Sequence, residues 1–288
     1  MGIAPSGGWC ARRLRIGTAG GREVPAARAG RGLIRPAWAN CHGVGALATT
    51  RLGGVSRPPY DTFNLGRGVG DEPERVDRNR RSLIDHMGVG DIQWLDQEHG
   101  TTVLAATVST AAGAPATADA AWTADENLGL AILTADCVPL LLADLGGGAV
   151  AAAHCGWRGT VGGVVEATVD AVPVRPQRLS AWLGPGICGR CYEVGADVVD
   201  RLEAHERAVV LTPKQSKWCL DLPSLIGHRL QRAGVRAIEY SGLCTHCDGR
   251  FFSYRRDGLT GRSATLIWRH RPATGGPERR IHDGSQPH

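Results

Sequence analysis

Residues 128–155 read LGLAILTADCVPLLLADLGGGAVAAAHC, and this stretch combines strand, turn and reactive side chains. It contains three short apolar runs of the kind that form buried strands: Leu128–Thr134, Val138–Ala143 and Ala149–Ala153. Gly146–Gly148 predict a tight turn between the second and third runs. That turn would fold the strand after Cys137 back beside the strand that leads to His154. One hairpin would thereby bring two soft metal ligands together.

Similar strand-like runs recur on both sides of this hairpin, at Ala46–Thr50, Thr102–Val108, Leu179–Leu183, Ala208–Leu211 and Ala264–Trp268. Helical spacing of apolar residues marks fewer segments, namely Glu74–His86, Thr160–Val172, Ala196–His205 and Leu222–Ala233. Pro73 and Pro223 suit the first turns of the first and last of these helices. Because strands outnumber helices and do not alternate strictly with them, we predict an α+β fold, with mixed sheets and packed helices.

The two ends of the chain differ in composition from the middle. Residues 1–32 and 271–288 are rich in Gly, Pro, Arg and polar residues without apolar periodicity, which predicts a disordered basic extension and a disordered tail. The folded part is expected to be one compact domain over residues 33–270. The first 32 residues hold six arginines and one glutamate, a surplus of positive charge that equals the net +5 of the whole chain. The predicted domain is therefore balanced in charge, and no nucleic-acid partner is expected.

Composition also bears on the compartment. No apolar run reaches the roughly 18 residues of a membrane span, so no membrane association is expected. Nine cysteines, an odd number, lack the density and pairing of a secreted disulfide scaffold, and the start of the chain lacks a signal peptide's apolar stretch. The Arg-rich start is Gly- and Ala-rich rather than Ser-rich, which favours a bacterial extension over a transit peptide. We predict a cytoplasmic protein.

Three short segments concentrate reactive side chains among small residues: QEHG at 97–100, TADC at 134–137 and HCGWRG at 154–159. Two histidines and one thiolate suit Zn²⁺, and three protein ligands leave the fourth tetrahedral position open, as in catalytic sites. Taken singly, however, a cysteine near apolar strands is more often a small buried hydrophobe, and a histidine is more often a hydrogen-bonded filler. The spacing alone therefore leaves a metal site and a packed core as alternatives.

These segments and four others resemble one family, the laccase-domain, YfiH-type purine nucleoside phosphorylases, formerly called polyphenol oxidases. The resemblance extends from about Trp38 to Trp268 and includes TTRLGGVS at 49–56, residues 60–66, LGP at 183–185 with CYEVG at 191–195, and FFSYRRD at 251–257 with TGR at 260–262. It implies that His99, Cys137 and His154 are the zinc ligands. Two departures are Cys155, where the family usually has Ala, and Glu98, where it often has Val or Thr.

The same resemblance implies the reaction. Adenosine, inosine, guanosine or S-methyl-5'-thioadenosine would be cleaved by phosphate to a free purine and a pentose 1-phosphate, with adenosine deamination as a second activity. The expected partners are thus purine nucleosides and phosphate. Arg51 and Arg158 lie in glycine-flanked loops, where a planar guanidinium can clamp phosphate or face solvent. Asn64, near the same cleft by resemblance, could bond a ribose hydroxyl or a base edge, and Asp136 could orient a ligating histidine or carry a proton.

Three other functions compete with this interpretation. A copper-dependent phenol oxidase needs many closely spaced histidines, and the ten here include no His-x-His. A cysteine hydrolase would use Cys137 as nucleophile and His154 as base, and a zinc-stabilised interaction module would need no turnover.

Two cysteine pairs, Cys188-x-x-Cys191 and Cys244-x-x-Cys247, resemble zinc knuckles. However, 52 residues separate the pairs instead of the usual 15 to 20 or so, so they are predicted to be packing thiols.

Overall fold

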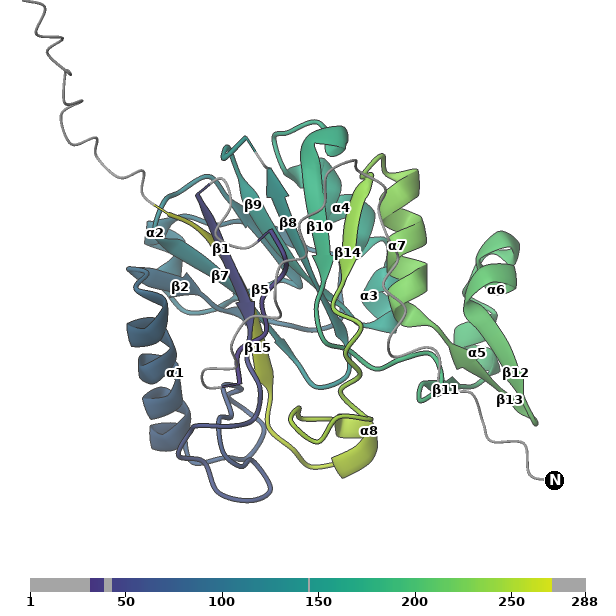
Figure 1. Ribbon diagram of the computed structural model, residues 1–288, viewed down its shortest axis with the longest axis horizontal. Coiled ribbons are helices and arrows are strands. Elements are labelled where there is room, and N and C mark those ends of the chain that lie inside the picture. The colour runs from purple at the N-terminus through teal and green to yellow at the C-terminus, as the bar shows by residue number, and fades with distance from the viewer. Residues whose placement is uncertain (1–31, 39–42, 145, 271–288) are drawn as a thin grey trace, which may run out of the picture.

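The computed structural model describes residues 32–38, 43–144 and 146–270. Within them the strands form two large and two small sheets (Figure 1). The six-stranded sheet has the order β14 (Ala237–Tyr240), β10 (Leu179–Leu183), β8 (Val138–Asp144), β9 (Val150–Cys155), β6 (Ala120–Thr123) and β4 (Val103–Ala105). The four-stranded sheet has the order β1 (Val44–Ala48), β15 (Ser263–Arg269), β7 (Leu128–Thr134) and β2 (Asp91–Gln93). The small sheets are β11 (Glu193–Val194), β13 (Lys217–Leu220) and β12 (Leu211–Lys214), and β3 (Leu95–Asp96) with β5 (Ala116–Thr117).

The helices are short apart from two. Their bounds are α1 Pro73–Met87, α2 Val108–Ala111, α3 Trp157–Gly162, α4 Val164–Ala171, α5 Ala196–Val199, α6 Ala204–Val210, α7 Leu222–Arg232 and α8 Tyr254–Asp257, with a 3₁₀ turn at Pro176–Arg178. Pro73 and Pro223 occupy the first turns of α1 and α7, as predicted. In the described part of the chain no helix has the length and apolar character needed to cross a bilayer.

The two large sheets pack face to face, and alternation along their central strands creates the core. On β7, Leu128, Leu130 and Ile132 point into the layer between the sheets, where they meet Leu141 of β8. The intervening residues of each strand point outward to helices. Because both faces of these strands are covered, their sequences are continuous apolar runs rather than alternating ones.

Helices cover the outer face of each large sheet, which gives four layers (Figure 1). Helix α1 covers the four-stranded sheet through Leu83, packed with Leu47 and Leu266. Helices α4 and α7 cover the six-stranded sheet, with Val165 and Leu225 packed against Leu140 and its neighbours. The predicted α+β class, with mixed sheets and packed helices, is confirmed by this architecture.

The predicted hairpin of strands β8 and β9 is confirmed. The two strands are antiparallel, with Val138 opposite Cys155 and Pro139 opposite His154. The carboxylate of Asp144 accepts hydrogen bonds from the backbone N–H groups of Gly146 and Gly148, both at 3.0 Å, and so closes the turn. The hairpin therefore places the residue before β8, Cys137, beside the end of β9.

Four of the predicted elements need correction. The strand expected over Thr102–Val108 is only β4, Val103–Ala105, because Thr107 caps helix α2, which begins at Val108. The helix expected over Thr160–Val172 is divided into α3 and α4 because Gly163 takes a left-handed φ of 104°. The helix expected over Ala196–His205 ends at Val199, and a second helix, α6, begins at Ala204.

The strand expected over Ala208–Leu211 is wrong, because its first three residues complete α6. One local and one tertiary feature favour the helix. A capping box joins Glu203 and Glu206 at its start, and the buried Glu206 carboxylate lies 2.8 Å from Arg229 on α7. The extension and tail predicted at 1–32 and 271–288 lie outside the described residues, apart from Gly32.

Candidate active site

The three sequence-predicted ligands come together at one end of the β8–β9 hairpin. His99 lies in the loop before β4, Cys137 lies in the turn between β7 and β8, and His154 lies on β9. Their possible ligand atoms all lie within 4.8 Å of one another, and Cys137 Sγ is 3.8 Å from His99 Nε2. His154 is buried, whereas His99 is exposed, so the cluster opens to the surface on the His99 side. Two imidazoles and one thiolate at this spacing can hold a metal ion.

A buried carboxylate that the sequence reasoning missed organises this cluster. Asp119 Oδ1 lies 2.7 Å from His154 Nδ1, which leaves His154 Nε2 for a metal. The same carboxylate accepts the backbone N–H groups of Glu98, His99 and Gly100 at 3.1, 3.0 and 2.6 Å. These bonds hold His99 in a left-handed conformation with φ 64°. In the sequence, the only sign of this role is that Asp119 is a single acid among small residues, directly before strand β6.

Cys137 and His154 shift each other's pKa. Burial raises the pKa of the Cys137 thiol, but His154 and His99 outweigh burial and lower it to about 6. Burial lowers the pKa of His154, whereas the Cys137 thiolate and Asp119 raise it to about 9. Without a metal, the pair at neutral pH is therefore a thiolate and an imidazolium. A bound cation would take the place of the imidazolium proton.

Gly156 packs directly against the cluster, which is possible only because it lacks a side chain. A Cβ atom at this position would lie 2.7 Å from His99 Cδ2 and 3.0 Å from Cys137 Sγ. Its φ of −73° suits any residue, so the requirement for glycine is steric. The glycines of the HCGWRG segment therefore include one that gives the two ligands room.

Cys155 does not join the cluster. As the neighbour of His154 on a strand it points to the opposite face, where it packs in the core with Leu140 and Val165. Burial raises the pKa of its thiol, and the nearby Cys137 and Glu166 raise it further. The departure from the family at this position is thus a buried apolar substitution.

Asp136 does not orient a histidine. Its backbone is left-handed, with φ 95°, and its carboxylate accepts hydrogen bonds at 2.6 Å from Thr245 Oγ1 and from the backbone N–H of Arg255. Asp136 therefore fastens the segment 245–255 beside Cys137, and the role considered for it in orienting a ligand belongs to Asp119.

Three arginines lie near the cluster, and two of them, Arg255 and Arg262, were not predicted from the sequence. Arg158 is exposed on α3, with its Cζ 4.5 Å from the centre of the Trp157 ring. Burial and Cys137 raise the pKa of Tyr192, whereas Arg255 and Arg158 lower it, so these groups are neighbours. Burial lowers the pKa of Arg262, while Cys137 raises it. Positive charge thus gathers around the thiolate.

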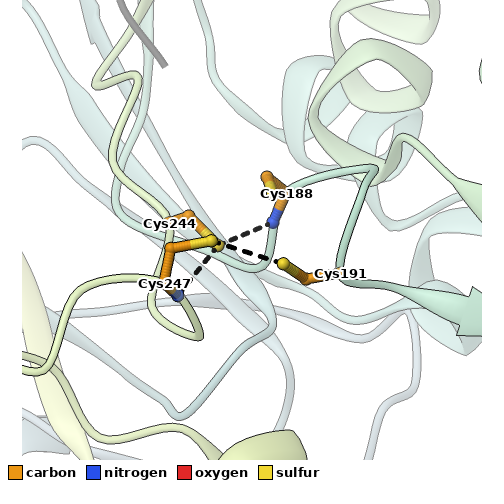
Figure 2. A group of neighbouring side chains, drawn as sticks. All are labelled: Cys188, Cys191, Cys244 and Cys247. Atoms are coloured by element: carbon orange, nitrogen blue, oxygen red, sulfur yellow. Dashed lines mark hydrogen bonds between the residues drawn. The ribbon is translucent and has the colours of Figure 1, made fainter. Parts of the chain in front are cut away.

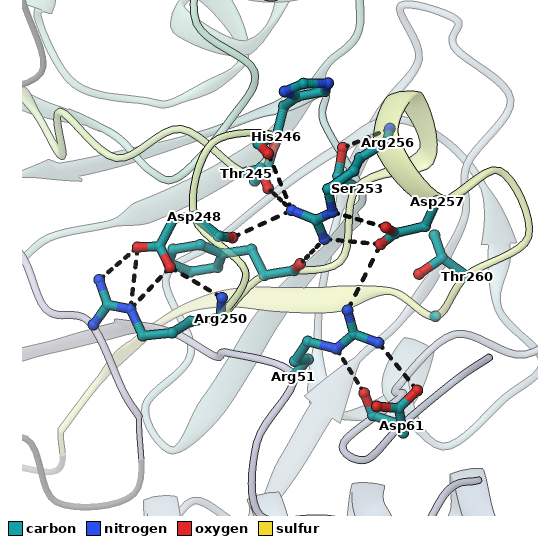
Figure 3. Close-up of polar contacts among 12 residues, drawn as sticks. Arg51, Asp61, Thr245, His246, Asp248, Arg250, Ser253, Arg256, Asp257 and Thr260 are labelled. Atoms are coloured by element: carbon teal, nitrogen blue, oxygen red, sulfur yellow. Dashed lines mark hydrogen bonds and ion pairs between the residues drawn. The ribbon is translucent and has the colours of Figure 1, made fainter. Parts of the chain in front are cut away.

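The Arg51 guanidinium contacts two acidic side chains (Figure 3), and the Asn64 amide bonds to backbone groups and one carboxylate. The Arg51 guanidinium lies 3.1 Å from the Asp61 carboxylate and 3.6 Å from that of Asp257, so two acids already neutralise it. Asn64 is fully buried. Its amide nitrogen donates to Gly66 O and Asp71, and its oxygen accepts from the N–H groups of Gly66 and Arg262. In this structure the buried Asn64 amide thus positions the Arg262 backbone.

The sequence profile of the family described as multi-copper polyphenol oxidoreductase laccase matches residues 45–270. This chain belongs to that family. It is 43% identical over 240 residues to a purine nucleoside phosphorylase of Pseudomonas aeruginosa, covering 82% of this chain and 97% of that protein. It is 40% identical over 243 residues to the purine nucleoside phosphorylase YfiH of Escherichia coli, covering 82% and 98%.

Solved structures agree with this membership. A Neisseria meningitidis protein superposes with a TM-score of 0.77 at 41% identity, covering 82% of this chain and 96% of that one. A Bacillus licheniformis YfiH protein superposes with a TM-score of 0.78 at 32% identity, covering 83% and 97%. The family resemblance drawn from the motifs is confirmed.

Proposed function

We propose that this protein is a zinc-dependent purine nucleoside phosphorylase that also deaminates adenosine. The observation that carries the proposal is the convergence of His99, Cys137 and His154 beside exposed and half-buried arginines. Relatives that share about two fifths of the sequence are named purine nucleoside phosphorylases. The proposed substrates are adenosine, inosine, guanosine and S-methyl-5'-thioadenosine, each with phosphate.

His99, Cys137 and His154 would hold the zinc ion. The donor set fits, because two imidazoles and one thiolate are preferred zinc ligands and one coordination position stays open. Zinc, when bound, would supply a Lewis acid at that position. Within the described residues only one group of three or more potential ligands contains histidine, which favours zinc over a multicopper centre.

The chain's own residues would bind the anion and guide protons. Arg158 presents an exposed planar guanidinium two residues after Gly156, suited to two parallel hydrogen bonds with phosphate. Arg262 Nη1 donates to the carbonyl groups of Thr260 and Gly261 and so holds a second guanidinium near Cys137. Asp119 keeps the proton of His154 on Nδ1, which directs Nε2 toward the cluster. Arg51 and Asn64, whose polar groups are already paired within the protein, take no part in these contacts.

A cysteine hydrolase is the second candidate, because Cys137, His154 and Asp119 are connected like a nucleophile, a base and its orienting acid. Both functions are tested on one purified sample. Its metal content is measured, and adenine and inosine released from adenosine are followed with and without phosphate. A phosphorylase requires phosphate for adenine release and loses activity in a chelator, whereas a cysteine hydrolase stays active in the chelator. Absence of phosphate-dependent purine release would contradict the proposal.

A further inference from the structure

Four cysteines outside the candidate active site lie together on two loops (Figure 2). Cys188 and Cys191 belong to the loop between β10 and β11, and Cys244 and Cys247 belong to the loop between β14 and α8. All four Sγ atoms lie within 4.8 Å of one another. The wide separation in sequence is bridged because β10 and β14 are parallel neighbours, so both loops leave the same edge of the sheet.

Backbone hydrogen bonds align the two loops without the help of a metal. Gly186 and Cys244 form a parallel bridge, and Thr245 N donates to Gly186 O at 3.1 Å. Two backbone N–H groups point at one sulfur: those of Cys188 and Cys247 lie 3.3 and 3.4 Å from Cys244 Sγ. N–H groups directed at sulfur stabilise the thiolate form that binds metals.

Arg256 holds the second loop through hydrogen bonds to its backbone carbonyl groups (Figure 3). Its guanidinium donates to the carbonyl oxygens of Thr245 at 2.8 Å and of Phe251 at 2.7 Å. An ion pair with Asp257 holds the guanidinium in place. The loop that presents Cys244 and Cys247 is thus shaped by the fold and does not depend on the sulfurs alone.

We propose that Cys188, Cys191, Cys244 and Cys247 bind one structural zinc ion per chain, at a site separate from His99, Cys137 and His154. Each pair has the Cys-x-x-Cys spacing of a zinc knuckle. Tetrahedral zinc with Zn–S bonds of about 2.3 Å places the sulfurs about 3.8 Å apart. Cys191 Sγ and Cys247 Sγ are 3.3 Å apart, so small side-chain rotations suffice.

Exposure argues against the sequence-based interpretation of these residues as packing thiols. Cys247 is exposed, and Cys188 and Cys191 are half-buried. Thiols that only fill a core are buried. Four thiolate ligands complete the shell of zinc and leave no open position, so the site is structural rather than catalytic.

The proposed zinc would stiffen one wall of the candidate active site. Tyr192 directly follows Cys191, and Thr245, which directly follows Cys244, bonds to Asp136 beside Cys137. The Cζ atom of Arg255 lies 5.1 Å from the centre of the Tyr192 ring. Joining the two loops therefore restrains Tyr192 and the bond between Thr245 and Asp136, the residue before Cys137.

The test is elemental analysis and native mass spectrometry of the full chain, purified under reducing conditions without added metal. We expect about two zinc ions per chain, one for each site. Cys191→Ser with Cys247→Ser should retain one, and His99→Ala with Cys137→Ser should also retain one. Cys219→Ser is the matched control, because Cys219 lies beside the same loop, 3.8 Å from Arg190 O, but outside the cluster, and should retain both.

Further measurements guard against a variant that fails to fold. Cys247→His keeps a zinc-binding donor set and should retain the second zinc, with a melting temperature between those of wild type and the double serine variant. After its zinc has been removed with a chelator under reducing conditions, the His99→Ala, Cys137→Ser protein should produce thiolate-to-cobalt charge-transfer absorption when cobalt is added. A zinc count that the double serine variant does not lower would overturn the proposal. So would iron in place of the second zinc, or a Cys191–Cys247 disulfide without a second metal.

Discussion

Asp119 Oδ1 lies 2.7 Å from Nδ1 of His154, and the Asp119 side chain is fully buried. Burial raises the pKa of Asp119, but the bonds from His154 and the loop N–H groups outweigh it and lower the pKa below its ordinary value. Because the same carboxylate holds the His99 loop, one acid positions two of the three proposed ligands.

Replacing Asp119 by Asn should weaken metal binding by about 10- to 100-fold, the range found when a partner that orients a metal ligand is lost. The amide keeps the size of the side chain but loses the negative charge that holds the His154 Nδ1 proton. Chelator competition measures the affinity. Asp96→Asn, at an exposed acid three residues before His99, is the control and should leave affinity unchanged. Equal affinities for all three proteins would show that Asp119 is only a structural carboxylate.

Metal affinity should rise with pH between about 7 and 9. In the metal-free protein the raised pKa of His154, about 9, keeps its imidazolium charged across this range. A metal needs the neutral nitrogen, so each unit of falling pH should lower affinity about tenfold. Competition with a chelator of known proton equilibria measures this. In Asp119→Asn the increase in metal affinity should occur at lower pH, because Asp119 no longer raises the pKa of His154. A metal affinity of the wild type that does not change with pH would show that no proton is displaced from His154.

Gly156→Ala should lower metal affinity by about tenfold or more, comparable to other disturbances of ligand orientation. The new methyl group would press on His99 and Cys137, at 2.7 and 3.0 Å. Gly249→Ala is the control, since a Cβ there meets no atom within 4 Å. Zinc content and chelator competition are compared for both variants. Full zinc retention by Gly156→Ala with unchanged affinity would count against the described packing.

Arg158→Lys should reduce phosphate-dependent adenine release strongly and adenosine deamination less, because lysine keeps the charge but loses the planar fork. His154→Ala removes a proposed ligand and should damage both activities. Arg201→Lys is the control for Arg158, since its guanidinium also lies near the Trp157 ring, at 6.0 Å. Adenine and inosine are measured separately. Equal loss of both products in Arg158→Lys, or loss of neither, would remove Arg158 from the phosphate site.

Arg229→Met should destabilise the protein by about 3–5 kcal/mol, because it leaves the buried Glu206 carboxylate without its charged partner. Arg232→Met, on the same helix but exposed, should cost no more than about 1 kcal/mol. Urea unfolding compares the variants with wild type. Similar losses for both would mean that the pair on α6 and α7 does not hold these helices together.

Local pattern was sufficient for the strands of the core, whereas the residues of the proposed catalytic centre also required the family resemblance. Strands β7 and β10 have the bounds predicted from sequence, because strands buried on both faces are continuous apolar runs that turn residues interrupt. The turn at Gly146–Gly148 is likewise local. His99, Cys137 and His154 were identified through motifs, whose spacing alone left a packed core as an alternative.

Apolar runs, turns and short motifs could be read from contiguous residues. Which distant segments meet became known only from the folded chain. Asp119 could be assigned only after its carboxylate was found against His154, and the four cysteines only after β10 was found beside β14. Helix α6 similarly depends on the pairing of Glu206 with Arg229 across the fold. These contacts follow from strand order and burial, which arise from the packing of the whole chain and leave no periodic trace in any one segment.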